Sequence, residues 1–383
     1  MTGLPKHADV VVIGGGVFGT SIAFHLAEAG VDVCLLERDE LASGSTSRAA
    51  GGVRAQFSDP LNIAIGLRSI EAFTRFAHRP GGEIDLAQVG YLFLLDRDED
   101  VAVFERSVAL QNELGVPSRF VTLDEVGELC PLARLDGVLA ATYCALDGHA
   151  SPEAVVQGYA AGARRHGATV LTRCAVTAIE SSEGEIVAVS AGAGAIETGV
   201  VVCAAGVWSP ALAEMVGVRL PVEPVLREVG FTGPVDGLPD RVPFTVDFST
   251  GFYFHREGPG LLFGMADRDQ RPGFDEPSDP DWLERVIEVA ERRLPRLLDM
   301  GVAGGWKGFY EVTPDHNALL GEAAEVSRFL YATGFSGHGF LQAPAVGEIV
   351  RDLVLGREPF VDVGPLSAGR FARSASRPEH NVI

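Results

Sequence analysis

The stretch Val10-Val11-Val12-Ile13-Gly14-Gly15-Gly16-Val17-Phe18-Gly19 decides the fold of this chain. Its four apolar residues predict a buried strand, and Phe18, Ile22 and Leu26 then follow at the spacing of one helix face. Gly30 is expected to end that helix, and a second strand is expected over 31–36, with Glu37 directly after it. This strand–helix–strand unit predicts a dinucleotide-binding α/β domain.

Each glycine of the motif has a physical role in holding a dinucleotide. Gly14 allows the tight turn after the strand, and Gly16 lets the backbone approach a pyrophosphate. Gly19 lets the helix pack closely on the strand. The helix begins at Val17 and Phe18, where free amide groups and the positive end of the helix dipole favour an anion.

Glu37 and its neighbour Arg38 complete the nucleotide motif, because a carboxylate at this strand end accepts both hydroxyls of the adenosine ribose. The motif alone does not separate FAD from NAD. Two further stretches favour FAD: the apolar run 200–206 ends in small residues before Trp208, and 334–340 is a glycine-rich turn expected before a helix. Backbone amides in such a turn hold anions well.

Length and composition limit the class of protein. A chain of 383 residues, 46% hydrophobic and 22% charged, predicts a globular protein of two domains. Its net charge of −21 argues against nucleic acid or an anionic membrane as a partner. The uncharged run 10–27 has the length of a membrane span or a signal peptide, but its glycines and His25 argue against both.

The rest of the chain predicts an α/β protein with a β-rich insertion between 220 and 310. Helices are expected over 60–77, 99–114, 151–167, 282–298 and 344–355. The polar tail after Arg370 is expected to be loosely held. The five cysteines form no C-x-x-C pair and no zinc-type cluster with histidine, so we predict no metal site and a reducing, cytoplasmic location.

Several further motifs resemble the flavoproteins of the D-amino-acid oxidase, glycine oxidase and sarcosine oxidase type, in particular the sarcosine oxidase beta subunits. They are the loop 45–52 (Ser-Thr-Ser-Arg-Ala-Ala-Gly-Gly), the run 204–209 (Ala-Ala-Gly-Val-Trp-Ser), 310–315 (Tyr-Glu-Val-Thr-Pro-Asp) and 334–340. The resemblance covers nearly the whole chain. It implies an α/β fold with a Rossmann-type FAD-binding domain over 1–82, 147–217 and 313–383. An antiparallel, β-rich substrate domain of the glutathione-reductase-like kind is inserted over 83–146 and 218–312.

The resemblance also implies the chemistry. FAD would lie extended and would take a hydride at N5 from the carbon beside an amine nitrogen. The helix N-terminus after Gly339, with His338, would face the N1–C2=O edge of the flavin, although His338 also fits an ordinary core histidine. The further cofactor contacts that the resemblance implies are Ser45, Thr46, Ser47, Arg48, Ala50, Gly51, Val176, Ala205, Gly206, Trp208, Gly334, Gly337, His338, Gly339 and Phe340.

Departures from the family pattern are informative. Gly308 and Arg48 stand where related enzymes carry the residues that bond covalently to FAD, so we expect noncovalent FAD. Leu262 and Leu341 stand where sarcosine oxidases carry an oxygen-activating lysine and a substrate-binding lysine. The electron acceptor and the substrate therefore stay open.

The resemblance implies Arg54, Tyr253 and Tyr310 as catalytic-site residues together with His338. Arg54 would bind a substrate carboxylate, with a structural ion pair as the alternative. Tyr253 and Tyr310 would line the substrate pocket, with ordinary cross-strand packing as the alternative. His255 lies two residues after Tyr253 and would share its strand face.

These observations predict an FAD-dependent amine or amino-acid oxidase or dehydrogenase. Its partner would be a small amine or amino acid, with no nucleic acid and no membrane span. A homo- or hetero-oligomer is compatible with the sequence. A noncatalytic or partner-dependent FAD-bearing subunit remains an alternative. A flavin hydroxylase would instead carry a Gly-Asp motif before its last helix, and an NAD-only dehydrogenase would leave the turn at 334–340 unexplained.

Overall fold

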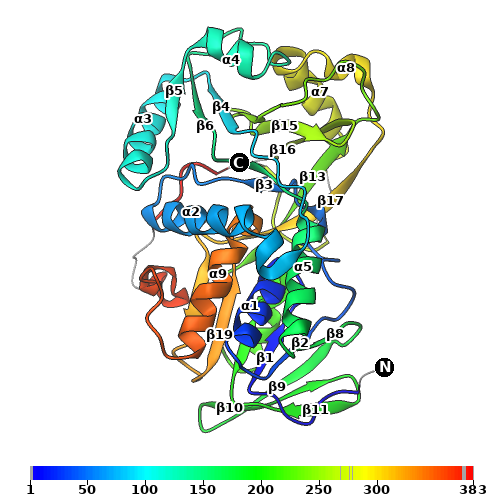
Figure 1. The fold of residues 1–383 in the computed structure, drawn as a ribbon, viewed down its shortest axis with the longest axis vertical. Coiled ribbons are helices and arrows are strands. Elements are labelled where there is room, and N and C mark those ends of the chain that lie inside the picture. Colours follow the sequence, from blue (N-terminus) through cyan, green and yellow to red (C-terminus); the bar gives the residue numbers. More distant parts are fainter. Residues whose placement is uncertain (1–2, 268, 276, 278, 373–376, 383) are drawn as a thin grey trace.

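A computed structural model describes residues 3–382 except 268, 276, 278 and 373–376. Figure 1 shows a lower part, in which helices cover a first sheet, and an upper part built around a second sheet. The first sheet has the strand order β18-β19-β12-β1-β2-β8. Its strands are β1 (Val10–Ile13), β2 (Val33–Leu36), β8 (Thr169–Leu171), β12 (Val201–Cys203), β18 (Leu319–Glu322) and β19 (Phe329–Thr333).

The predicted strand–helix–strand unit is confirmed as β1, α1 (Val17–Glu28) and β2. β1 pairs in parallel with β2 on one side and β12 on the other. Val10 and Val12 are buried in one core cluster and Val11 and Ile13 in another, so both faces of the strand are covered, as its continuous apolar sequence predicts. Gly14 has a φ of +113°, and a Cβ at Gly19 would lie 1.8 Å from the Gly14 carbonyl oxygen. Only glycine at 19 therefore lets the helix lie this close to the strand.

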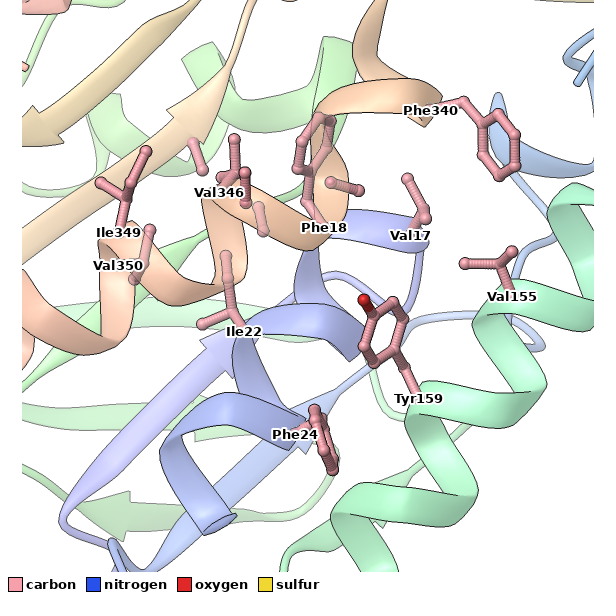
Figure 2. Packing of buried hydrophobic residues seen from close by; sticks show 14 of the residues in the cluster. Val17, Phe18, Ile22, Phe24, Val155, Tyr159, Phe340, Val346, Ile349 and Val350 are labelled. Carbon is pink, nitrogen blue, oxygen red and sulfur yellow. The ribbon is translucent and has the colours of Figure 1, made fainter. Parts of the chain in front are cut away.

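Three helices that are far apart in sequence form the main core on the first sheet. Figure 2 shows α1 lying between α9 (Gly339–Val354) and α5 (Pro152–Arg165). Phe18 and Ile22 lie on the side of α9, and Phe24 lies on the side of α5, where its ring centroid is 5.6 Å from that of Tyr159. α2 (Pro60–Thr74) packs on α9, and Asp59 caps it by accepting the Leu61 amide at 2.8 Å, as the Asp-Pro start predicted.

The second sheet has the strand order β17-β13-β16-β15-β14-β4-β6-β5. Its neighbouring strands are antiparallel except for the parallel pair β14 and β4. The strands are β4 (Tyr91–Leu95), β5 (Arg119–Val121), β6 (Ala140–Cys144), β13 (Glu223–Phe231), β14 (Phe244–Asp247), β15 (Phe252–Glu257), β16 (Gly260–Met265) and β17 (Gly304–Val312). The helices of this part are α3 (Asp98–Glu113), α4 (Leu123–Leu129), α7 (Trp282–Arg293) and α8 (Leu297–Met300).

Smaller elements complete the described chain. β9 (Val176–Ser182), β10 (Glu185–Ala191) and β11 (Gly194–Glu197) form a third sheet, and β3 (Gly52–Val53) pairs with β7 (Gly148–His149). α6 (Ser209–Glu214) follows the short turn Gly206–Trp208. All strands of the second sheet fall within 83–146 and 218–312, and this supports our proposed domain division.

Two helices differ from the sequence expectation. The last helix begins at Gly339, not at 344, and continues through Pro344. Proline there disturbs the helical hydrogen bonding, and the Ala345 amide donates to the Ser69 Oγ at 3.2 Å. The helix expected over 282–298 is divided into α7 and α8 around Pro295, which cannot donate a backbone hydrogen bond.

The expectation of a loosely held tail is wrong for residues 377–382. Glu379 is only 3% exposed, and its carboxylate accepts hydrogen bonds from the Ser58 amide at 2.8 Å and the Asn62 side chain at 2.9 Å. Asn381 is fully buried. This segment is held by charge-assisted hydrogen bonds, which its polar composition does not reveal.

The apolar run 10–27 is divided between β1 and α1, so it forms no continuous span. Within the described residues, no helix is both long enough and apolar enough to cross a membrane. The cysteines of the described chain are all free thiols, and Cys34 and Cys203 are buried as predicted.

Candidate active site

A cavity of about 380 Å³ lies between the carboxyl ends of the first-sheet strands and the inner face of the second sheet. This is where open α/β sheets bind ligands. The cavity is lined from the first side by residues within 13–18, 36–39, 43–54, 174–176, 204–212 and 336–341, and from the second by Tyr91, Arg227, Val229, Phe244, Tyr253 and 308–311.

The predicted site residues all line this cavity except Gly19, Ser47 and Gly334. Gly19 acts through helix packing, as described above. Gly334 has a φ of +73°, and a Cβ there would lie 2.5 Å from the Thr313 methyl group, so it shapes the turn from behind. The structure therefore brings the predicted residues together, while the role of each stays a prediction.

Glu37 organises the nucleotide end of the cavity. One carboxylate oxygen accepts the Gly15 amide at 2.6 Å, and the other accepts the Asp39 amide at 2.8 Å. A carboxylate offers about four lone-pair positions. Each oxygen of Glu37 thus keeps acceptor capacity for a ribose hydroxyl while its orientation is held by the backbone.

A flat cationic surface adjoins Glu37. The Arg38 guanidinium lies over the Trp208 ring, with Cζ 3.9 Å from the ring centroid. Val176, from the third sheet, lines the same end. An aromatic ring stacked on a guanidinium beside an apolar side chain suits the planar adenine of a dinucleotide.

The loop 45–51 connects the nucleotide end to the middle of the cavity. The Ser45 hydroxyl donates to the Phe309 carbonyl at 2.7 Å, and the Thr46 hydroxyl accepts the Val17 amide at 3.2 Å. Arg48 packs against Gly308, where an added Cβ would lie 2.7 Å from the Arg48 Cβ. The two positions that we expect to correspond to the attaching residues of related flavoproteins are therefore neighbours, and neither has a nucleophilic side chain.

The N-terminus of α9 points to the middle of the cavity, where Gly337, His338, Gly339 and Phe340 line the wall. His338 is 3% exposed, and its Nε2 is buried without a hydrogen-bond partner in the described chain. Burial lowers the pKa of His338 to about 3, so this side chain is neutral near pH 7. Because His338 lines the cavity, this ring nitrogen is available for a hydrogen bond to a bound molecule or water.

Sequence reasoning missed that an acid of β17, Glu311, packs against the glycine-rich turn. The Glu311 carboxylate accepts the Thr333 hydroxyl at 2.8 Å and lines the cavity. Burial raises the pKa of Glu311 to about 7, against hydrogen bonds from Thr333, Gly334 and Phe335 that lower it. Part of the expected anion nest is thus filled from within the chain.

Arg54 lines the cavity, but its setting is unexpected. It is 4% exposed and lies over the Phe57 ring, with Cζ 4.1 Å from the centroid. Its guanidinium donates to the Gln56 carbonyl, and to the Asn381 carbonyl at 2.6 Å. The alternative of a structural ion pair is not what the described residues show, because both partners are neutral carbonyl groups.

The two predicted tyrosines lie on β15 and β17 of the second sheet, with β13 and β16 between these strands; Tyr253 is buried and Tyr310 is half-buried. Tyr253 and His255 share one face of β15, where the Phe244 ring lies 5.4 Å from Tyr253 and 4.8 Å from His255. Tyr310 lies beside Gly337, whose Cβ would come within 2.3 Å of its ring. Burial raises the pKa of both tyrosines, so both stay protonated hydrogen-bond donors.

Other lining residues were not found from the sequence: Tyr91, Phe244, Arg227 and Val382. Arg227 offered a signal, because it is a charged residue within an apolar strand sequence. Val382 offered none, because only tertiary structure brings the segment 377–382 to the cavity.

One cluster outside the cavity lining has metal-ligand residue types: His149, His255 and Glu257, whose donor atoms lie within 4.8 Å of one another. Both ring nitrogens of His255 already contact carbonyl oxygens, of Arg256 at 2.8 Å and of Ala50 at 3.0 Å. Each ring nitrogen of His255 already faces a carbonyl oxygen, so neither is free to bind a metal, and we assign no metal to this cluster.

Comparison with known proteins agrees with this geometry. Two solved structures resemble the chain over nearly its full length. L-proline dehydrogenase from P. horikoshii has a TM-score of 0.92 at 33% identity, covering 98% of this chain and 100% of that one. Glycine oxidase from Geobacillus kaustophilus has a TM-score of 0.85 at 27% identity, covering 96% and 99%.

Sequence relatives give the same result. The mitochondrial dimethylglycine dehydrogenase of Mus musculus is 30% identical over 96% of this chain, which spans only 44% of that relative's length. FAD-dependent oxidoreductase domain-containing protein 1 of Bos taurus is 30% identical over 99% of this chain and 88% of its own length. The family profile described as "DAO: FAD dependent oxidoreductase" matches residues 9–353, and the chain therefore belongs to the DAO family of FAD-dependent oxidoreductases.

Proposed function

We propose that this enzyme oxidises the C–N bond of a small amino acid or N-methyl amino acid. The observation that carries the proposal is one continuous cavity, lined by the nucleotide motif at one end and by Arg54, Tyr91, Tyr253 and Tyr310 at the other. The likeness to L-proline dehydrogenase and glycine oxidase supports an amino acid, since both are named for one.

The described residues fit FAD. Gly14 allows the strand end to lie against the Ala204 carbonyl, Gly16 carries no side chain at the N-terminus of α1, and Glu37 is oriented for a ribose. At the other end of the dinucleotide path, α9 presents its N-terminus and the unpartnered Nε2 of His338. Bound FAD supplies the hydride acceptor for the substrate C–H.

The side chains at the substrate end would position the substrate. Arg54 offers its remaining N–H groups to a carboxylate, and its contacts with Phe57, Gln56 and Asn381 hold it in place. Tyr253, which is buried, and Tyr310, which is half-buried, stay protonated donors that would orient the amine or carboxylate and exclude water. No side-chain base is needed when the amine arrives neutral.

His338 is neutral and so offers no positive charge near the cofactor. Negative charge that develops there would be stabilised mainly by the amides at the N-terminus of α9. Glu311 lies behind this turn and is half protonated near pH 7, because burial raises its pKa to about 7. In its neutral form, it adds no negative charge near the cofactor.

Three finer points belong to the same proposal. FAD is held noncovalently, because Arg48 and Gly308 occupy the attachment positions. The chain works on a small molecule in the cytoplasm, with or without a second subunit. Leu262 and Leu341 are buried apolar residues at the two lysine positions, so an acceptor other than oxygen is expected to be faster.

The test is anaerobic bleaching of the flavin in the purified yellow protein with amino acids, N-methyl amino acids and simple amines. We expect an amino acid or N-methyl amino acid to bleach the flavin fastest, and a dye to reoxidise it faster than oxygen does. If no member of the panel bleaches the flavin of the isolated chain, the noncatalytic or partner-dependent alternative is favoured.

A further inference from the structure

Arg227 is a second cation that lines the cavity, and its side chain is half-buried. It projects from β13, and its guanidinium Cζ lies 5.3 Å from the centroid of the Tyr310 ring. Its Nε is buried without a hydrogen-bond partner in the described chain. Its other contacts are long hydrogen bonds from Nη1 to the carbonyls of Leu226 at 3.2 Å and Asp267 at 3.3 Å.

Two buried arginines with structural roles, Arg293 and Arg370, are each paired with carboxylates. Arg293 bonds Asp247 and Asp96, each at 3.0 Å. Arg370 bonds Asp315 through two nitrogens, at 2.9 and 2.8 Å. A buried guanidinium is normally paired with a carboxylate because desolvation of an isolated charge is costly.

The two cavity arginines depart from this pattern. Among the described residues, neither Arg54 nor Arg227 has a carboxylate within ion-pair distance, and both bond only backbone carbonyls. Asp267, the carboxylate that acts on Arg227 from a distance, is itself ion-paired with Arg285 at 3.2 Å. Burial lowers the pKa of both arginines, because each positive charge is partly removed from water without a paired carboxylate.

The two cations are held apart by different elements. Arg54 follows β3 and is held by Phe57 and the carbonyl of Asn381, whereas Arg227 lies on β13 across from Gly308. The charges of both arginines act on Tyr310: burial raises the pKa of Tyr310, and Arg227 and then Arg54 oppose that rise. One small carboxylate would neutralise one arginine and leave the other uncompensated.

We propose that the substrate end has two anion-binding positions, Arg54 and Arg227, and that the substrate is an amine bearing two acidic groups. Amino acids with an acidic side chain and N-carboxyalkyl amino acids belong to this class. This inference rests on the proposed function only for the amine. Two fixed arginines would orient such a molecule at both ends and hold its C–N bond beside Tyr310.

The first experiment needs no turnover. Binding of succinate and glutarate to the oxidised holoenzyme is compared with binding of butyrate and pentanoate, through perturbation of the flavin absorbance spectrum. We expect each diacid to bind about tenfold or more tightly than the monoacid of equal length, the gain of one charged hydrogen-bonded pair. Equal binding of diacids and monoacids would overturn the inference.

Variants then assign the second position. R227Q should abolish the preference for diacids and leave monoacid binding within about threefold, and R227K should restore part of the preference. R256Q is the matched control, because Arg256 bonds the Pro239 carbonyl at 2.9 Å and lies outside the cavity lining. If R227Q weakens diacids and monoacids equally, both arginines hold one carboxylate. If it instead reduces FAD affinity, Arg227 serves the cofactor, and the inference fails in either case.

Turnover separates this inference from the proposed function. Flavin bleaching by an acidic amino acid and by its neutral amide is compared in the wild type and in R227Q. We expect the wild type to prefer the acid and R227Q to lose that preference. If only neutral amino acids bleach the wild-type flavin, the proposed function stands and this inference fails. If diacids bind preferentially but no amine bleaches the flavin, the two anion-binding positions stand and the proposed function fails.

Discussion

Replacement of Glu37 by Gln tests the nucleotide end of the site. In the structure, each carboxylate oxygen of Glu37 accepts one backbone amide, from Gly15 at 2.6 Å and from Asp39 at 2.8 Å. Gln retains one acceptor oxygen and places an NH2 group against the other amide. It also removes the charge that strengthens both bonds to the ribose hydroxyls.

The expected magnitude follows from this geometry. Loss of one charged hydrogen bond to the ribose and weakening of the other should cost about 1.5–3 kcal/mol, or roughly ten- to a hundredfold in FAD affinity. FMN lacks the adenosine ribose, so its affinity should hardly change. Glu40→Gln is the control variant, since Glu40 is exposed and pairs only with Arg173 in the described chain, at 2.6 Å.

The assay is titration of the apoprotein with FAD and with FMN, followed by flavin fluorescence, together with the melting temperature of each apoprotein. Unchanged FAD affinity in Glu37→Gln would refute the assignment of Glu37 to the ribose. Equal weakening of FAD and FMN, together with a lower apoprotein melting temperature, would show that Glu37 acts only by holding the Gly15 turn.

The remaining predictions concern attachment of FAD, Arg54 and pH. Because Arg48 and Gly308 cannot attach FAD, acid precipitation should leave a white pellet and a yellow supernatant, and a pellet that stays yellow after washing would contradict this. Arg54→Lys keeps the charge but loses the fork of N–H groups, so stopped-flow reduction by an acidic substrate should slow roughly ten- to a hundredfold. Reduction by a decarboxylated analogue should change little, and equal losses would make Arg54 purely structural. Burial lowers the pKa of His25, His255 and His338 to about 3 and that of His149 to about 4, from an ordinary 6.5. The unfolded chain therefore binds more protons at these four sites, and their contribution to the stability of the folded protein is lost as pH falls below 6.5. Burial raises the pKa of Asp147 and Glu311 to about 7, so these two carboxyl groups stabilise the folded protein increasingly as pH falls from 7 toward their ordinary pKa values. The histidines outnumber the acids, so the apoprotein melting temperature should fall from pH 6.5 to 4.5 and fall more steeply below it; a flat or rising profile would contradict the reasoning.

The amino-acid sequence alone was sufficient for the β1–α1–β2 unit and its glycines. Gly14, Gly16, Gly19 and Glu37 lie within one local unit, where chain spacing and helix geometry determine which groups meet. Apolar runs and turn residues also predicted a β-rich insertion between 220 and 310, where β13 to β17 of the second sheet lie, because such patterns report local structure. That 83–146 belongs to the same antiparallel domain was implied only by the family resemblance.

Only the tertiary structure decided the substrate end. Arg54 and the carbonyl of Asn381 are 327 positions apart and bond at 2.6 Å, and Glu311 fills a turn expected to be free for an anion. Arg227 comes to lie over Tyr310 because β13 pairs with β17. Such contacts depend on strand pairing and on buried hydrogen bonds between segments that are distant in sequence. Hydrophobic periodicity and local spacing report local structure only, so they do not specify which distant partner a charged side chain contacts.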